Sequence, residues 1–112
     1  MTSAGKAYLA SLPESVVDNY IADTRLVPYT DKTITKDSAL KEEMEATREK
    51  GYALEIGEIN DGIGSIAIPI FDKREDCIGT ISLSGANEQI LEEEAEAFAT
   101  VHDFLEELNP LW

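Results

Sequence analysis

Short polar side chains recur at two-residue spacing in the second half of the chain. Ser65 is followed by Ala67 and Ser82 by Ser84, and a carboxyl residue, Glu55, precedes both pairs. The serine segments are rich in isoleucine, and residues two apart in a strand lie on one face of its sheet. Hydroxyl groups and one carboxyl group among small side chains are typical of a small-molecule pocket. The spacing therefore predicts such a pocket.

The same segments divide into two unlike faces. One face is apolar and predicts packing against helices; it comprises Tyr52, Leu54, Ile56, Ile66, Ile68, Ile70, Ile81 and Leu83. The other is small and polar; it comprises Ala53, Glu55, Gly57, Ser65, Ala67, Pro69, Thr80, Ser82 and Ser84, with Ile78 as its one large apolar member. A hydrated sheet face would also carry serines and threonines. In so acidic a chain a hydrated face should carry more charges, so we favour a covered one.

The remaining reactive side chains form no catalytic or metal-binding set. His102 lies beside the apolar stripe of a predicted helix, without a cysteine or serine at a motif spacing, and is expected to be structural. Cys77 is expected to be a passive thiol. No spacing is typical of metal ligands. We therefore expect no enzyme, cofactor or metal; a hydrolase or isomerase with Glu55 as general base is the alternative.

Periodicity predicts four helices and three strands, which is an α+β protein. The helices are expected at residues 3–10, 13–23, 37–50 and 87–108, and the strands at 52–58, 64–71 and 77–85. Asp37 and Asn87 are the expected N-caps of two helices, Gly51 ends one, and 24–36 forms an ordered loop. Short connections favour an antiparallel meander. The last helix should pack through Leu91, Ala95, Phe98, Val101, Leu105 and Leu108.

Length and charge exclude several classes of protein. The chain has 112 residues, enough for one domain with its own core, and a net charge of −14. Affinity for nucleic acid comes largely from lysine and arginine, and with 9 of these the chain alone should not bind DNA. Neither a signal peptide nor the roughly 18 apolar residues of a membrane span is recognised, so we expect a cytoplasmic protein. The acidity predicts a halophilic source, with an acidic protein-binding surface as the alternative.

A series of short segments runs in one order through nearly the whole chain. The segments are Ala4-Gly5-Lys6-Ala7, Leu9-Ala10, Tyr29-Thr30, Thr33-Ile34-Thr35, Arg48-Glu49-Lys50-Gly51-Tyr52-Ala53, Glu58, Gly62, Ile66-Ala67, Pro69-Ile70-Phe71-Asp72 and Ile81-Ser82-Leu83-Ser84-Gly85. In this order they resemble the effector-binding domain of the IclR family of transcription regulators. The resemblance implies an antiparallel sheet flanked by helices, in the profilin-like, GAF-related class of sensor domains.

The resemblance also implies a ligand site and partners. The ligand contacts of the family would fall on Ser3, Ala4, Glu55, Ser65, Ser82 and Ser84. The implied ligand is a small organic acid or aromatic metabolite, and the implied assembly is a dimer or tetramer of identical chains. Glu55 stands where the family often has aspartate; its charge would repel an anion and its extra methylene narrows the cavity, which favours a hydroxylated, neutral or smaller ligand. Ser65 stands where relatives can have cysteine.

Two functions fit the resemblance. In the first, residues 1–112 are a single effector-binding domain that senses a small organic acid and forms oligomers. The family pattern has a winged helix-turn-helix domain and opening strands before Ala4-Gly5-Lys6-Ala7, and we expect neither here. DNA would then be reached only through such a domain elsewhere, and an unpaired sheet edge predicts a homo-oligomer. In the second function, the chain is a protein–protein interaction module that has lost ligand binding.

Overall fold

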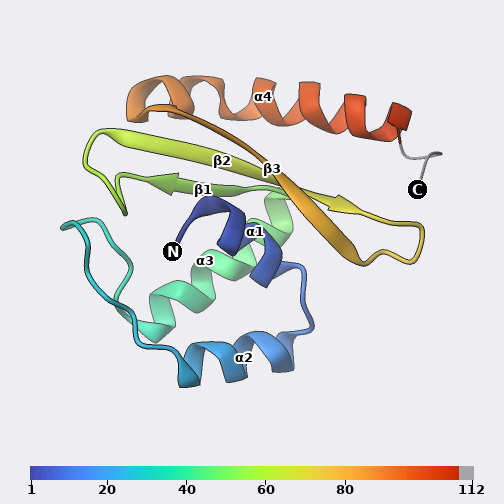
Figure 1. Ribbon diagram of the computed structural model, residues 1–112. Helices are drawn as coiled ribbons and strands as arrows, with labels where there is room; N and C mark the ends of the chain where they lie inside the picture. The colour runs from blue at the N-terminus through green and yellow to red at the C-terminus, as the bar shows by residue number, and fades with distance from the viewer. Residues whose placement is uncertain (109–112) are drawn as a thin grey trace.

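A three-stranded antiparallel sheet forms the middle layer of the protein in a computed structural model, which describes residues 1–108 (Figure 1). The elements follow in the order α1 (Ser3–Ala10), α2 (Glu14–Asp23), α3 (Asp37–Lys50), β1 (Ala53–Ile56), β2 (Ile63–Phe71), β3 (Cys77–Ala86) and α4 (Asn87–Leu108). Helix α4 lies on one side of the sheet, and α1, α3 and α2 lie on the other. The strand order β1-β2-β3 confirms the α+β class and the antiparallel meander.

The small polar face of the sheet packs against α1. Ala7 of α1 is buried together with Ala53 of β1 and Ala67 of β2, and Ala4 packs against this group. Side chains of one methyl group on both surfaces let the helix approach the strands closely. The expectation of a covered face is thus met over β1 and β2, and α1 is the cover.

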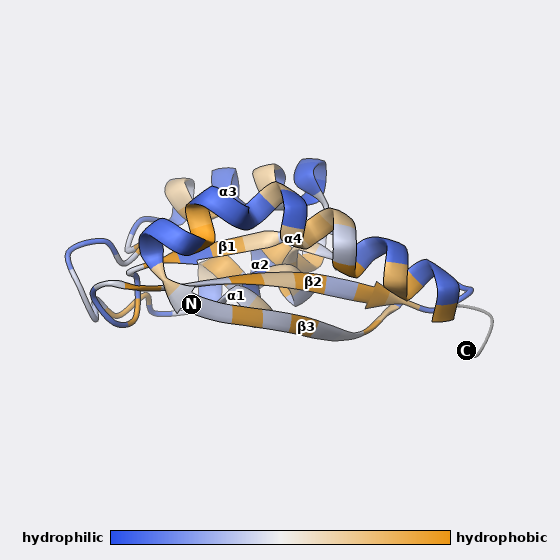
Figure 2. Ribbon diagram, turned by 90° about the horizontal axis from the view of Figure 1, so that it is seen from above, coloured by the Kyte–Doolittle hydropathy of each residue, from blue (hydrophilic) through white to orange (hydrophobic). Residues whose placement is uncertain are grey.

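The apolar face packs against α4. Tyr52, Ile66 and Ile68 are its buried residues, and the ring centres of Tyr52 and Phe98 are 4.8 Å apart. The α4 side chains in this layer are Ala97, Phe98, Val101 and Leu105. Hydrophobic stretches follow the strands, whereas α3 and α4 carry hydrophilic stretches on their outer surfaces (Figure 2). The two faces of the sheet are therefore as unlike as their sequences predict.

The predicted packing face of α4 is wrong at its N-terminal end. Leu91 and Ala95 are exposed, whereas Ile90 is buried. Ile90 lies against Gly85 of β3, where even an added Cβ would make an ordinary contact of 3.7 Å with the Ile90 side chain. The first turn of α4 consequently turns Ile90 rather than Leu91 to the sheet. None of the described helices is long and apolar enough to span a bilayer.

The helix ends follow from local chemistry. Thr2 caps α1, because its hydroxyl oxygen accepts a hydrogen bond of 3.0 Å from the Gly5 amide. Asp37 is not the N-cap of α3; Lys36 holds that position and Asp37 begins the helix, where a carboxylate still favours the positive end of the dipole. Gly51 ends α3 with a φ of 85°, a left-handed conformation that suits glycine.

The strands differ slightly from their predicted bounds. β1 ends at Ile56, before Gly57, whose φ of 67° turns the chain out of the strand. The register of β2 and β3 shifts between Ile70 and Phe71, so that Ile78 is the extra residue of a bulge and is 56% exposed. Ile78 therefore has no regular place on the small polar face.

Helices α1, α2 and α3 enclose a second core below the sheet. It contains Leu9, Ala10, Val17, Ile21, Leu40 and Met44. The loop that follows α2 is ordered, as predicted, because its threonines bind the turn after β1. Thr30 Oγ1 donates to the Gly57 carbonyl oxygen at 2.5 Å, and Thr33 Oγ1 donates to that of Glu58.

Candidate functional site

Three of the residues expected at the ligand site form a row across the sheet. Glu55 of β1 pairs with Ser65 of β2, and Ser65 pairs with Ser84 of β3. Ser82 pairs with Ala67 in the next row but one, on the same face. The structure thus brings the four strand residues together on the face of the sheet that packs against α1.

The row is completed by the first turn of α1. The Ser65 hydroxyl donates a 2.7 Å hydrogen bond to Ser3 Oγ, and both side chains are buried. Ala4, the next residue, packs over the alanines of β1 and β2. The Glu55 carboxylate is also buried and accepts a 3.1 Å hydrogen bond from the Glu58 amide. Ser3, Ser65 and Glu55 therefore already have partners within the protein.

Ser82 and Ser84 differ from these three because they are exposed. They lie on β3, the outer strand of the sheet, and Thr80 before them is half-buried. We name Thr80, Ser82 and Ser84 the β3 strip. Packing against α1 accounts for the small residues of β1 and β2 without any ligand. It does not account for three hydroxyl residues that α1 leaves accessible.

A buried lysine lies next to this row. Lys6 of α1 is fully buried, and its Nζ donates to Glu58 Oε2 at 2.6 Å and to Glu43 Oε1 at 3.1 Å. A third bond of 2.7 Å goes to the Leu54 carbonyl oxygen of β1, an edge strand. We name Lys6, Glu43 and Glu58 the Lys6 cluster. It ties α1 to α3 and to the end of β1, and so fixes the helix turn that covers the row.

Reasoning from the sequence missed the Lys6 cluster. The one available signal was a single lysine within an alanine-rich helix, Ala4 to Ala10, that is otherwise free of charge. The partners are 37 and 52 positions away in the chain, so no local spacing connects them. One ammonium group faces two carboxyl groups, and Glu58 Oε1 is buried without a hydrogen-bond partner among the described residues.

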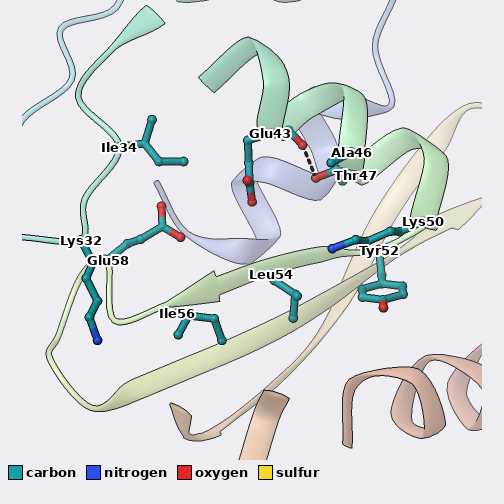
Figure 3. A pocket seen from close by; sticks show the side chains of 10 residues that line it. All are labelled: Lys32, Ile34, Glu43, Ala46, Thr47, Lys50, Tyr52, Leu54, Ile56 and Glu58. Atoms are coloured by element: carbon teal, nitrogen blue, oxygen red, sulfur yellow. Dashed lines mark hydrogen bonds between the residues drawn. The ribbon is translucent and has the colours of Figure 1, made fainter. Parts of the chain in front are cut away.

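A groove of about 330 Å³ opens beside the cluster, between α3 and the edge strand β1 (Figure 3). Leu54, Ile56 and Ile34 give it apolar walls, and Glu43 and Glu58 turn their carboxyl groups toward one another at one side. We name it the α3–β1 groove. It lies at the β1 edge of the sheet, and the β3 strip lies at the opposite edge, so the two are separate surfaces.

Two further hollows lie outside this groove. One of about 420 Å³ begins at Thr2, beside the start of α1, and is bounded by Tyr20, Arg25 and Tyr29. Another of about 210 Å³ separates β3 from α4 and includes Ser84 on its border.

The structure also groups His102, Asp103 and Glu106 on the exposed side of α4. One ligand atom of each lies within 4.8 Å of the others, and His102 Nε2 is 3.7 Å from Glu106 Oε1. The His102 ring lies 5.3 Å from that of Phe98. All three residues are exposed, and their spacing on one helix accounts for their proximity. His102 thus lies beside the apolar stripe, as expected.

Comparison with known proteins agrees with this architecture. The chain is 32% identical over 105 residues to the glycerol operon regulatory protein of Streptomyces coelicolor, covering 91% of this chain and 41% of that protein. It is 32% identical over 100 residues to the transcriptional repressor IclR of Escherichia coli, covering 89% and 36%. The chain thus spans about two fifths of the length of these relatives, which are transcription regulators and not enzymes.

Solved structures give the same result. The IclR of Thermotoga maritima superposes with a TM-score of 0.80 at 35% identity, over 97% of this chain and 43% of that one. The C-terminal domain of the Escherichia coli regulator KdgR superposes with a TM-score of 0.84 at 27% identity, over 97% and 67%. Residues 1–108 match the family described as the bacterial transcriptional regulator IclR, C-terminal. The chain therefore belongs to the IclR family, as its effector-binding C-terminal domain.

Proposed function

We propose that this domain binds a small organic acid or a related metabolite and forms homo-oligomers, as the sensing part of an IclR-type regulator. The β3 strip carries this proposal, because its hydroxyl groups stay accessible beside the first turn of α1 while the rest of the face is filled. A double mutant of the inducer-binding domain of PobR from Acinetobacter, solved as a complex with 3-hydroxybenzoic acid, supports it; the TM-score is 0.84 at 25% identity, over 99% of this chain and 65% of that one.

The chemistry of the strip suits an acid. The Ser82 and Ser84 hydroxyls can each donate a hydrogen bond to a carboxylate oxygen. The amides of the first turn of α1 add donors and the positive end of the helix dipole, which favours an anion. Ser3 and Ala4 belong to that turn. Five of the six residues carried over from the family thus have a proposed role: Ser82 and Ser84 bind the ligand, and Ser3, Ala4 and Ser65 shape the inner wall.

Glu55 bears on the choice of ligand. A buried carboxylate beside an anionic ligand would repel it, unless a hydroxyl group of the ligand lies between them. The Glu58 amide already binds one oxygen of Glu55 and leaves the other to accept a hydrogen bond. Glu55 lies on β1, with β2 between it and the β3 strip, so we propose that its charge disfavours a plain acid that extends toward it and favours a hydroxylated one.

The open edge of β3 supports the proposed oligomer. β3 is an outer strand of ten residues, and none of them is charged or proline. Proteins usually protect exposed edges with charges or prolines, because free N–H and C=O groups pair readily with another strand. The proposed partners of this edge are further strands of a longer regulator or a second copy of the chain. DNA would be reached through a winged helix-turn-helix domain of that regulator.

An interaction module without a ligand is the second candidate function. The observation that favours it is the Ser3–Ser65 hydrogen bond, which closes the inner part of the site. In this case the edge of β3 would still pair with another chain, and the β3 strip would bind water but no ligand.

A thermal-melt screen separates the two. We expect a hydroxy-acid, keto-acid or aromatic acid, with 3-hydroxybenzoic acid included, to raise the Tm by about 10 °C at 100 times its Kd. The double variant Ser82→Val with Ser84→Val should lose this rise and keep the oligomeric mass. Thr100→Val, which removes an exposed hydroxyl on α4, should keep both the rise in Tm and the oligomeric mass. A hit that survives the double substitution would place binding elsewhere and refute the role of the strip.

A further inference from the structure

The α3–β1 groove contains an unusual charge arrangement. The side chain of Glu58 is 9% exposed, and its Oε1 is covered by protein without accepting a hydrogen bond from any described residue. Its other oxygen and Glu43 Oε1 share one ammonium group, that of Lys6. A single positive charge cannot balance two carboxylates. The cluster therefore has room for a second cationic donor.

The groove offers that donor a place. Glu43 and Glu58 line the wall of the groove, and their carboxyl groups face one another there (Figure 3). Lys6 reaches the pair from the α1 side, which leaves the groove side of both carboxyl groups to a ligand. Glu58 Oε1 itself is covered by protein, so a ligand in the groove would bind it only after the Glu58 side chain turns toward the groove.

The rest of the groove is apolar and narrow. Ile34, Leu54 and Ile56 line it, and Ala46 of α3 keeps it open by its small size. A volume of about 330 Å³ is at the lower end for small-molecule sites. It suits a short aliphatic or aromatic body attached to a charged group.

Two lysines at the borders of the groove would instead attract a ligand with a negative charge. Lys32 and Lys50 are exposed, and the Lys50 ammonium lies 5.9 Å from the Tyr52 ring centre. Exposed ammonium groups stay hydrated and attract an anion only weakly. A buried carboxylate oxygen without a donor, as Glu58 Oε1 is among the described residues, has lost its water, so a hydrogen bond to it gains more. The carboxyl groups inside the groove, and not the exposed lysines at its border, therefore determine that the ligand carries a positive charge.

We propose that the α3–β1 groove binds a small primary ammonium compound with a short apolar body, whose charged group is held between Glu43 and Glu58. This site is distinct from the β3 strip and does not depend on the function proposed for it. Through the shared Lys6 cluster, a ligand here contacts the group that holds α1 in place.

The test uses n-butylammonium chloride, with sodium butanoate as a probe of the same body and opposite charge. Titrations at constant ionic strength are followed by amide chemical shifts in nuclear magnetic resonance spectra. Because the probe is small, we expect a Kd of about 1 mM or weaker. Butylammonium should shift the Ala46, Thr47 and Leu54 signals saturably, and butanoate should not.

Three variants locate the binding. Glu58→Gln keeps a hydrogen-bond acceptor for Lys6, removes the charge, and should weaken butylammonium binding about tenfold. Ala46→Leu fills the groove, leaves every charge in place and should abolish binding. Glu42→Gln, an exposed change of equal charge on α3, should have no effect. The proposal would be overturned if butanoate bound as well as butylammonium, or if Glu58→Gln and Ala46→Leu left butylammonium binding unchanged. The absence of any saturable shift with butylammonium would also overturn it and would mean that Glu58 Oε1 is hydrated.

Discussion

Lys6 is the residue whose loss we expect to cost the most stability. It is fully buried and its three hydrogen bonds join α1, α3 and β1. Lys6→Met keeps much of the volume but leaves the Glu58 carboxylate buried without a counter-charge. Breaking a buried ion pair in this way lowers the free energy of unfolding by about 3–5 kcal/mol. Urea denaturation of the variant checks this value.

The control is a lysine with an equivalent pairing at the surface. Lys41 lies 3.2 Å from Asp18, and both side chains are nearly half exposed. Lys41→Met should leave the urea midpoint almost unchanged, because exposed ion pairs contribute little. If Lys6→Met were as stable as Lys41→Met, the Lys6 cluster would not hold α1 to the sheet.

The packing of Tyr52, just before β1, against α4 should make the free energy of unfolding sensitive to alkaline pH. Burial of Tyr52 beneath α4, and secondarily the negative charge of Glu94, raises the pKa of its phenol above the usual value near 10. The unfolded chain then releases this proton first. The free energy of unfolding is therefore unaffected below about pH 10 and falls as pH rises through the pKa of folded Tyr52.

Tyr52→Phe isolates this contribution. Urea midpoints measured from neutral to strongly alkaline pH should fall less steeply in the variant than in the wild type. Tyr29→Phe, which alters a tyrosine that is 67% exposed, should follow the wild type. Parallel curves for Tyr52→Phe and the wild type would mean that the phenol is not held away from water by α4.

Local patterns predicted the elements, but not how tightly one element covers another. The two-residue alternation gave both sheet faces, because side-chain direction in a strand depends only on neighbouring residues. The alternation did not show what covers the small polar face of the sheet, a ligand or a helix. Ala7 packs on Ala53 and Ala67 and supplies the helix, whereas Ser82 and Ser84 on β3 stay exposed. Long-range pairings such as Ser3 with Ser65 depend on the assembled fold and have no local signature.

For the molecule as a whole, the net charge of −14 predicts that salt stabilises the fold. Repulsion among carboxylates opposes the compact state, and screening shortens its range from about 10 Å at 0.1 M salt to about 3 Å at 1 M. The urea midpoint should rise over this range of potassium chloride. Neutralising Glu92, Glu93 and Glu96 of α4 with glutamine should flatten the rise, since all three are exposed. A midpoint that falls with salt would contradict a salt-adapted surface.

At the scale of assembly, the proposed oligomer is expected to form through the edge of β3. β3 is an outer strand of ten uncharged residues, so its free edge can pair with another strand. In a symmetric dimer, β3 of a second copy would pair with it in antiparallel orientation and extend the sheet. Ile78→Glu places a carboxylate on this edge, and a symmetric pair would bring two of them into the interface. Sedimentation velocity should then show the protein shifting from an oligomer toward a monomer, with its Tm little changed.

Ile63→Glu is the matched control for the edge. Ile63 is 50% exposed against 56% for Ile78, but it begins the central strand β2, which has a neighbour on each side. The same charge there should leave the mass unchanged, because β2 offers no free edge to a second copy. If both variants kept the oligomer, assembly would proceed through another surface, and the proposed strand pairing across β3 would be wrong.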